Sequence, residues 1–174
     1  VKRVFLFEPQ KEQIKALKET IKINGFDHCN IIEKAVSNKS GTISFNINEN
    51  NTTASGISYT SEANLIVEST TIDEYFDENT SSPFVFLIDA EGAELSIIEG
   101  GRTFIENNTP LIIFEYNHVS KKHFKLEDVK KELGSKYSIY RLRKDGALDE
   151  NFLNTWNLVA FPNNNSFFKI QDVK

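Results

Sequence analysis

Acidic side chains follow several apolar runs of this sequence, at the points where strands are expected to end. Glu8 follows "VFLF", Asp89 follows "FVFLI" and Glu115 ends "LIIFE". Ligands of open α/β sheets bind outside the carboxyl ends of the strands, so these acids are the first residues to consider for chemistry. If the strands are parallel, the three carboxylates are expected at one rim of the sheet.

Two more acids, Glu91 and Glu94, follow Asp89 within five positions. Aspartate is a good helix N-cap, which would explain Asp89 by itself because a helix is expected directly after it. Three acids exceed what capping requires, and their charges repel unless a cation, a polar ligand or solvent separates them. A divalent metal could gather them, but the nearby His118 and His123 show no recognisable ligand spacing, so no metal is predicted.

Glu8 has two interpretations that its position leaves open. Its carboxylate could accept hydrogen bonds from both hydroxyls of a nucleoside ribose, as acids in nucleotide-binding α/β folds do. It could instead be an acid that stabilises the N-terminus of a helix beginning near Pro9 through the helix dipole.

Length and composition restrict the class of protein. The chain has 174 residues, 39% of them hydrophobic, and a formal charge of -5, so we expect one domain over 1–174 and no nucleic-acid partner. The single cysteine, Cys29, cannot form an internal disulfide, which favours a reducing compartment and hence the cytoplasm. No apolar run is long enough to predict a membrane span.

Hydrophobic periodicity predicts alternating strands and helices. The predicted strands are 4–7, 30–36, 41–47, 84–88, 111–115, 137–143 and 157–162. The predicted helices are 10–24, 92–106 and 125–133, and the Asn-, Ser- and Thr-rich stretch from Asn48 to Glu62 is expected to be a loop. This order implies an α/β fold with right-handed crossovers.

Five fragments, in order and spacing, resemble the FkbM family of S-adenosylmethionine-dependent methyltransferases. They are "FLFEPQKEQIKALKETIKINGF", "EKAVSNKSGTISF", "TTIDEYF", "FLIDAEGAELSIIEGG" and "PLIIFE", which together span Val4 to about Glu115. The resemblance implies a Rossmann-like class I methyltransferase sheet that is mostly parallel, with an antiparallel last strand and helices on both faces. It also implies S-adenosyl-L-methionine as cofactor and methylation of a hydroxyl on a sugar, polyketide or other small molecule.

Carried over residue by residue, the resemblance implies a cofactor site. Glu8 would bind the ribose, and the end of the next strand would flank the adenine through Lys34, Ala35 and Val36. Asp89 would stand close to the methionine and methyl end of the cofactor.

The same resemblance implies a second set of residues near the acceptor. Glu91 and Glu94 would shape the site from the turn, and Glu94 and Glu115 are expected to face the substrate. Methyl transfer to a hydroxyl can be assisted by removal of a proton, so Asp89 and Glu91 are the predicted catalytic residues. Burial or a neighbouring acid would raise the pKa of such a base toward neutrality.

One part of the family pattern is not found in this sequence. The first strand and its glycine-rich loop are expected upstream of Val1, so the domain is predicted to be N-terminally truncated. A strand edge exposed next to Val4 would favour association into a homo-oligomer. An alternative from another class is a non-catalytic interaction or carbohydrate-binding module built on the same sheet.

Overall fold

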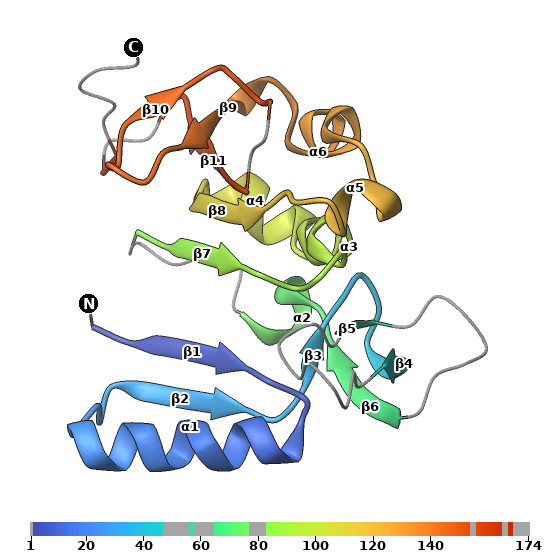
Figure 1. Ribbon diagram of the computed structural model, residues 1–174, viewed down its shortest axis with the longest axis vertical. Coiled ribbons are helices and arrows are strands. Elements are labelled where there is room, and N and C mark those ends of the chain that lie inside the picture. Colours follow the sequence, from blue (N-terminus) through green and yellow to red (C-terminus); the bar gives the residue numbers. More distant parts are fainter. Residues whose placement is uncertain are drawn as a thin grey trace.

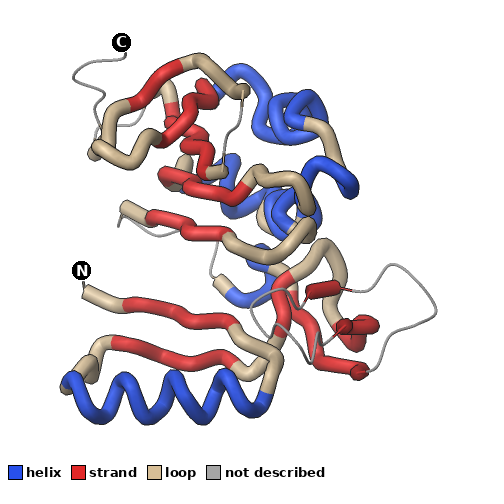
Figure 2. The backbone as a smooth tube through the Cα atoms, viewed as in Figure 1, coloured by secondary structure: helices blue, strands red, loops and turns tan. Residues whose placement is uncertain are grey.

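Strands and helices alternate in the computed structural model, which describes residues 2–46, 56–57, 65–76, 83–153, 156–164 and 167–168 (Figures 1 and 2). The fold is a mixed α/β fold with three groups of hydrogen-bonded strands, in the orders β1-β2, β10-β9-β11-β8-β7 and β3-β6-β4-β5. No helix in the described part of the chain is long and apolar enough to cross a membrane.

The first unit is the strand, helix and strand that the sequence predicts. Strand β1 (Val4–Phe7) pairs in parallel with β2 (Cys29–Ile32), and helix α1 (Lys11–Asn24) connects them. The helix ends at Gly25, whose left-handed backbone (φ 64°) lets its N–H bond to the Ile21 carbonyl. The apolar stripe of the helix is anchored by Ile14, which is buried.

The predicted strand 30–36 is wrong in one respect, because it is two strands in different sheets. The Lys34 N–H donates to the Ile32 carbonyl (2.8 Å), a tight turn that ends β2. After this turn, β3 (Ala35–Val36) pairs in parallel with β6 (Leu65–Thr70).

Strand β6 also pairs with β4 (Gly41–Asn46), which confirms the predicted strand there, and β4 pairs with β5 (Gly56–Ile57). Short helix α2 (Ile72–Tyr75) follows β6. The predicted loop from Asn48 to Glu62 contains β5, and its other residues lie outside the described ones.

The largest sheet contains parallel and antiparallel neighbours. Strand β7 (Val85–Ile88) pairs in parallel with β8 (Leu111–Glu115). The later strands of this sheet are β9 (Tyr137–Leu142), β10 (Leu148–Asp149) and β11 (Asn157–Pro162). β11 lies antiparallel between β8 and β9, so the expected antiparallel closing strand is present. The expected single, mostly parallel sheet is not found among the described residues. Their strands form three sheets, of which β1-β2 is parallel and the other two contain both directions.

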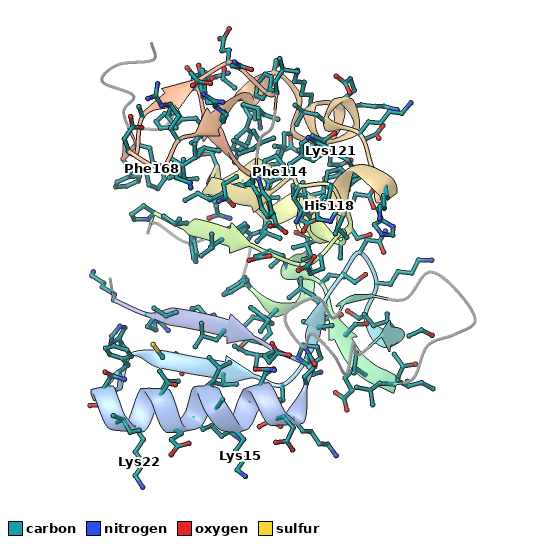
Figure 3. All side chains as sticks on the ribbon, in the orientation of Figure 1. Lys15, Lys22, Phe114, His118, Lys121 and Phe168 are labelled. Carbon is teal, nitrogen blue, oxygen red and sulfur yellow. The ribbon has the colours of Figure 1, made fainter. Side chains whose placement is uncertain are left out.

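Helices α3 (Glu94–Glu99), α4 (Arg102–Asn108) and α6 (Leu126–Leu133) contribute the apolar side chains that complete the core of this sheet. Phe114, Ile112 and Leu158 from the strands pack with Ile98 and Val129 from the helices, and all are at most 1% exposed. Figure 3 shows Phe114 inside this layer, whereas Lys15 and Lys22 project outward from α1. The 3-10 helix Gly134–Lys136 leads from α6 into β9.

The predicted helix 92–106 is wrong, because two glycines divide it into α3 and α4. A Cβ atom on Gly100 would lie 2.1 Å from the Ser37 carbonyl oxygen, so only glycine permits this approach. On Gly101 it would lie 3.0 Å from Ile72. The chain segments after β3 and β6 therefore fix the break.

An aromatic cluster joins the first unit to the large sheet. The Phe76 ring lies 5.0 Å from Phe5 of β1, 6.0 Å from Phe84 just before β7 and 5.5 Å from Phe104 of α4, measured between centroids. Edge-on and tilted ring pairs of this kind are favourable beyond the area that they bury. Among the described residues, β1 and β7 belong to different sheets and are not paired by hydrogen bonds. Packing of these aromatic rings connects the two strands instead.

Candidate active site

The carboxyl ends of four strands point to one side of the molecule. In Figure 1 the arrowheads of β1, β2, β7 and β8 all face the same way. Ile88 of β7 is in register with Phe114 of β8, so the next residues, Asp89 and Glu115, leave their strands side by side. This is the edge at which α/β proteins bind ligands.

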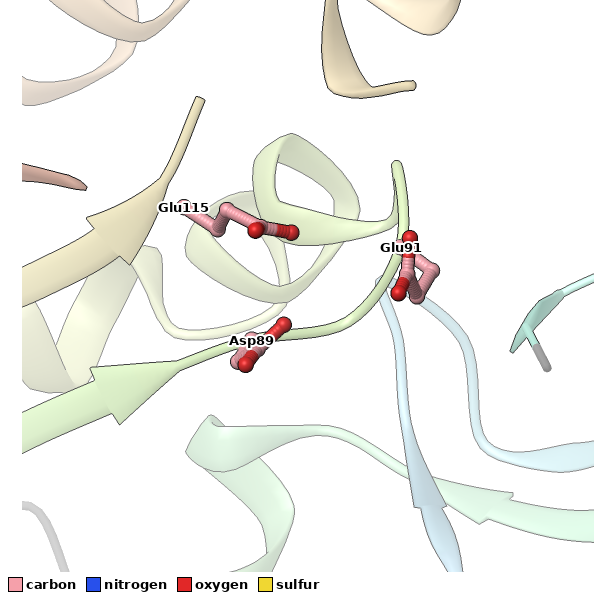
Figure 4. Close-up of side chains that lie close together, drawn as sticks. All are labelled: Asp89, Glu91 and Glu115. Atoms are coloured by element: carbon pink, nitrogen blue, oxygen red, sulfur yellow. The ribbon is translucent and has the colours of Figure 1, made fainter. Parts of the chain in front are cut away.

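Three carboxylates converge at this edge, and we call Asp89, Glu91 and Glu115 the acidic rim. One carboxylate oxygen from each lies within 4.8 Å of the other two. Figure 4 shows the three side chains turned toward a common space, Asp89 and Glu115 from the two strand ends and Glu91 from the turn. Asp89 is exposed and the other two are partly buried.

The turn 89–93 has an unusual backbone. Glu91 has a φ of 48° and Gly92 a φ of 102°, so two successive residues lie on the positive side of φ. A non-glycine residue there is uncommon, and such strain is found where surrounding contacts hold it. A Cβ atom on Gly92 would lie 2.4 Å from the Cδ2 atom of His123, so the His123 ring covers this glycine closely.

Glu94, expected to face the substrate, is 0% exposed. Its Oε1 accepts the Ala90 N–H (3.1 Å), and its Oε2 accepts the Gly92 N–H (3.0 Å). The carboxylate therefore binds the backbone of the turn, on the protein side of the acidic rim. Burial raises the pKa of Glu94, and hydrogen bonds from the turn and from Ser120 work against this rise.

Glu115 has the most perturbed carboxyl group of the rim. Its pKa is raised to about 7, mainly by desolvation and then by the negative charge of Asp89; Asn117 opposes the rise through a side-chain hydrogen bond. Its Oε2 is buried and has no hydrogen-bond partner among the described residues. A buried acceptor without a donor is costly, so this oxygen suits a proton or a ligand that donates a hydrogen bond.

The pKa of Glu91 depends on groups in the turn after β7 and in the loop after β8. Desolvation raises its pKa first, followed by the charges of Asp89 and Glu94, whereas His118 lowers it. His118 lies in the loop after β8, where its ring contacts that of Trp156 at 6.4 Å between centroids. The sequence did not identify His118 and His123 as neighbours of the turn, although two loops that follow adjacent parallel strands must emerge at the same edge.

Glu8 lies at the end of β1 and is not a member of the acidic rim. Its Oε1 accepts the Gln10 N–H at 2.8 Å, just before α1 begins. Desolvation raises its pKa, and the bond from Gln10 partly offsets this rise. The carboxylate thus has a structural partner on the helix side, consistent with the second sequence interpretation, and the ribose role stays a prediction.

The residues predicted to flank an adenine come directly after β2, and two of them belong to a different sheet from the strand that Glu8 follows. Lys34 lies in the turn between β2 and β3, with its Nζ 3.3 Å from the Glu68 carboxylate. Ala35 is buried and Val36 is partly buried, both in β3. Their predicted contact with a cofactor stays a prediction.

The acidic rim can act chemically in three ways. Its oxygens can accept hydrogen bonds from hydroxyl or ammonium groups, share a proton, or approach a hard cation. The sequence expectation of no metal stays a prediction, because three carboxylate oxygens at this separation would also suit a cation.

An α/β fold with acids at the carboxyl ends of adjacent parallel strands is typical of proteins that bind nucleotides and related cofactors. This chain belongs to the methyltransferase FkbM domain family, whose model matches residues 1–137. The resemblance noted in the sequence is therefore confirmed at the level of the family.

A solved structure is similar in fold. The chain is similar to the crystal structure of methyltransferase FkbM from Methylobacillus flagellatus KT, with a TM-score of 0.61 and 16% sequence identity. The match covers 92% of this chain and 36% of that one, so the 174 residues span about a third of its length. No curated protein sequence matches the chain.

Proposed function

We propose that this chain contributes the acidic rim of an S-adenosylmethionine-dependent methyltransferase that acts on a hydroxyl oxygen of a small molecule. The observation that carries the proposal is the convergence of Asp89, Glu91 and Glu115 at adjacent strand ends in a member of this family. A hydroxyl that receives a methyl group loses its proton, and nearby carboxylates can accept it.

The residues present fit the cofactor. S-adenosylmethionine presents ribose hydroxyls and an ammonium group, which are the donors that carboxylates accept best. Glu8 would hold the ribose, with Lys34, Ala35 and Val36 beside the adenine and Asp89 toward the methionine end. The unpartnered Oε2 of Glu115 supports the presence of a donor at the rim. When bound, the cofactor supplies the methyl group from its sulfonium.

Glu115 joins Asp89 and Glu91 as a proton-accepting group in this proposal. Its pKa of about 7 means that it takes up or releases a proton near neutral pH, as an efficient general base does. Desolvation keeps that pKa high, and the negative charges of Asp89 and Glu91 add to it, since adjacent carboxylates resist being charged together. We infer that the three carboxylates act together on the acceptor hydroxyl.

A further parallel strand between β1 and β7 is part of the proposal. Each of these strands is the edge of its sheet among the described residues, and Val85 and Leu87 of β7 are 55% and 76% exposed. Unpaired apolar edges of this kind suit an additional strand. The first strand and glycine-rich loop that the family resemblance implies would fill this position and approach the cofactor.

Calorimetry with S-adenosylhomocysteine tests the cofactor part. We expect heat of binding in a form extended by its upstream coding sequence, and about tenfold weaker binding after Glu8→Gln. Glu12→Gln, an exposed acid on the first turn of α1, is the matched control and should bind as the unmodified protein does. Absence of binding in both the extended form and this chain would favour the non-catalytic module.

Turnover tests the acid–base part. Production of S-adenosylhomocysteine in the presence of hydroxylated acceptors should fall about 100-fold in Asp89→Asn and Glu91→Gln, and Glu91→Gln should keep its affinity for the cofactor. Glu106→Gln, a glutamate of α4 outside the acidic rim, serves as the control. Unchanged turnover in both variants would disprove the assignment of Asp89 and Glu91 as the base.

A further inference from the structure

Buried polar side chains gather directly behind the acidic rim. Of the six polar or charged residues that are buried in the described part of the chain, Glu94, Asn117 and Ser120 lie in the segments that follow β7 and β8. Glu94 is the only acid among them, and it has no exposed surface. A carboxylate is costly to bury, so its retention requires compensating hydrogen bonds.

We propose that Glu94 is the positioning residue of the acidic rim. Its buried carboxylate holds the turn 89–93 in its left-handed form, so that Asp89 and Glu91 face Glu115. The inference deepens the proposed function, because it explains how the three carboxylates are held together. Only the expected effect of Glu94 on turnover rests on the proposed function.

The first reason is the backbone of the turn. The positive φ of Glu91 is unfavourable for a residue with a side chain and must be stabilised by its surroundings. Glu94 binds the N–H groups on both sides of Glu91, those of Ala90 and Gly92. The two bonds bracket the strained residue, and without an acceptor there both N–H groups would be left unsatisfied.

The second reason is a connection to the other strand. Asn117 accepts the Val119 and Ser120 N–H groups through its Oδ1 (2.6 and 3.1 Å), which fixes the start of helix α5 (Ser120–His123). The Ser120 hydroxyl donates to the Glu115 carbonyl oxygen at 3.5 Å. The Ser120 side chain also opposes the rise of the Glu94 pKa, so it lies beside the Glu94 carboxylate. Glu94 is therefore next to the segments that carry both halves of the rim.

A pair of substitutions separates the position of the carboxylate from its charge. Glu94→Gln removes the charge and keeps one acceptor oxygen, which at the position of Oε1 can accept both the Ala90 and the Gly92 N–H groups (3.1 and 3.2 Å). It loses only the second bond to Gly92, the one that Oε2 accepts (3.0 Å). Glu94→Ala removes the same charge and all of these bonds. Any difference between these two variants therefore reports positioning, since the electrostatic change is shared.

The measurements use the chain without cofactor. Carbon NMR titration should show that the midpoint of Glu115 falls by about one pH unit more in Glu94→Ala than in Glu94→Gln, because Asp89 and Glu91 move away from it. Amide exchange of Gly92 should accelerate about tenfold or more in the alanine variant and stay slow in the glutamine variant. Equal midpoints and equal exchange in the two variants would overturn the proposal.

Two further variants keep the proposal testable if the alanine variant does not fold. Ser120→Ala removes the bridge between the segments and should lower the Glu115 midpoint while leaving Gly92 exchange slow; an unchanged midpoint would overturn the proposed connection. Ile98→Val, a core substitution in α3, should lower thermal stability without moving the midpoint. If the Glu115 titration midpoint falls in Ile98→Val together with the thermal stability, that result would also count against Glu94 as the positioning residue.

Different experiments test the proposed function and this inference, so one can be wrong while the other is right. If no form of the protein binds S-adenosylhomocysteine, the function is wrong, whereas the titration and exchange results on Glu94 still decide how the rim is held.

Discussion

Acids lie at the strand ends of this protein in two regions, and their surroundings differ between the end of β1 and the ends of β7 and β8. At the end of β1, burial raises the pKa of Glu8, and one local residue, Gln10, lowers it through its backbone N–H and its side chain. At the ends of β7 and β8, the pKa of Glu115 is raised by burial and also by the charges of Asp89, Glu91 and Glu94. The first is an isolated carboxylate, and the second belongs to a coupled group.

The difference suggests a division of roles. An isolated carboxylate that accepts a backbone N–H is suited to hold a hydrogen-bond donor such as a hydroxyl. A crowded group whose members resist simultaneous ionisation is suited to take up and release protons. Substitutions at matched positions in the two regions test whether their roles differ in this way.

The largest effect is expected from Gly92→Ala in the turn behind the acidic rim. The added Cβ would meet the His123 ring at 2.4 Å, and the backbone φ of 102° is itself unfavourable for alanine. We expect a loss of about 3 kcal/mol in the free energy of unfolding, measured by urea denaturation.

Gly25→Ala at the end of α1 is the matched control in the Glu8 region. This glycine also has a positive φ (64°), but nothing lies within 4 Å of its added Cβ. We expect a loss of about 1 kcal/mol from the backbone alone. Equal losses in the two variants would show that His123 does not constrain the turn.

A smaller effect is expected in the pH dependence of stability. The pKa of Glu115 is about 7 in the folded protein and has the ordinary value of 4.5 as its reference, so the folded state binds this proton more tightly. Its contribution to stability is fully present below about pH 4.5 and is lost as the pH rises through about 7. The unfolding temperature should therefore fall over this range.

Glu115→Gln should flatten that part of the profile, because the amide does not titrate. Thermal unfolding between pH 4.5 and pH 8 measures the slope, and Glu106→Gln, a glutamate outside the rim, should leave it unchanged. Part of the slope will remain, because burial also raises the pKa values of Glu8, Glu91 and Glu94. A slope as steep in Glu115→Gln as in the unmodified protein would contradict the raised pKa of Glu115. Repeating the series with Mg²⁺ tests the expectation that the rim holds no metal, since a bound cation would favour the ionised carboxylates.

Local patterns were sufficient for part of this structure. Helical periodicity and Gly25 predicted α1, and the apolar runs that stop at Asp89 and Glu115 predicted two strand ends that the register places side by side. These features depend on the residues within each element and on the parallel pairing of adjacent strands.

Contacts between distant segments determined the rest. The break between α3 and α4 depends on Ser37, more than sixty positions earlier, whose carbonyl leaves no room for a side chain at Gly100. The end of β2 at Ile32 depends on β3 joining β6. Buried Glu94 lies beside Ser120, the first residue of α5, which is more than twenty positions later in the chain. Periodicity within a short window contains no information on such contacts.

The smallest effect on stability is expected from Glu8→Gln. The amide oxygen of glutamine can still accept the Gln10 N–H, so we expect a change below about 1 kcal/mol in urea denaturation. The pH profile should change little compared with Glu115→Gln, because no neighbouring charge adds to the burial that raises the pKa of Glu8. A change in pH dependence as large as that of Glu115→Gln would show that the two strand ends are not electrostatically distinct, and the division of roles between them would then be wrong.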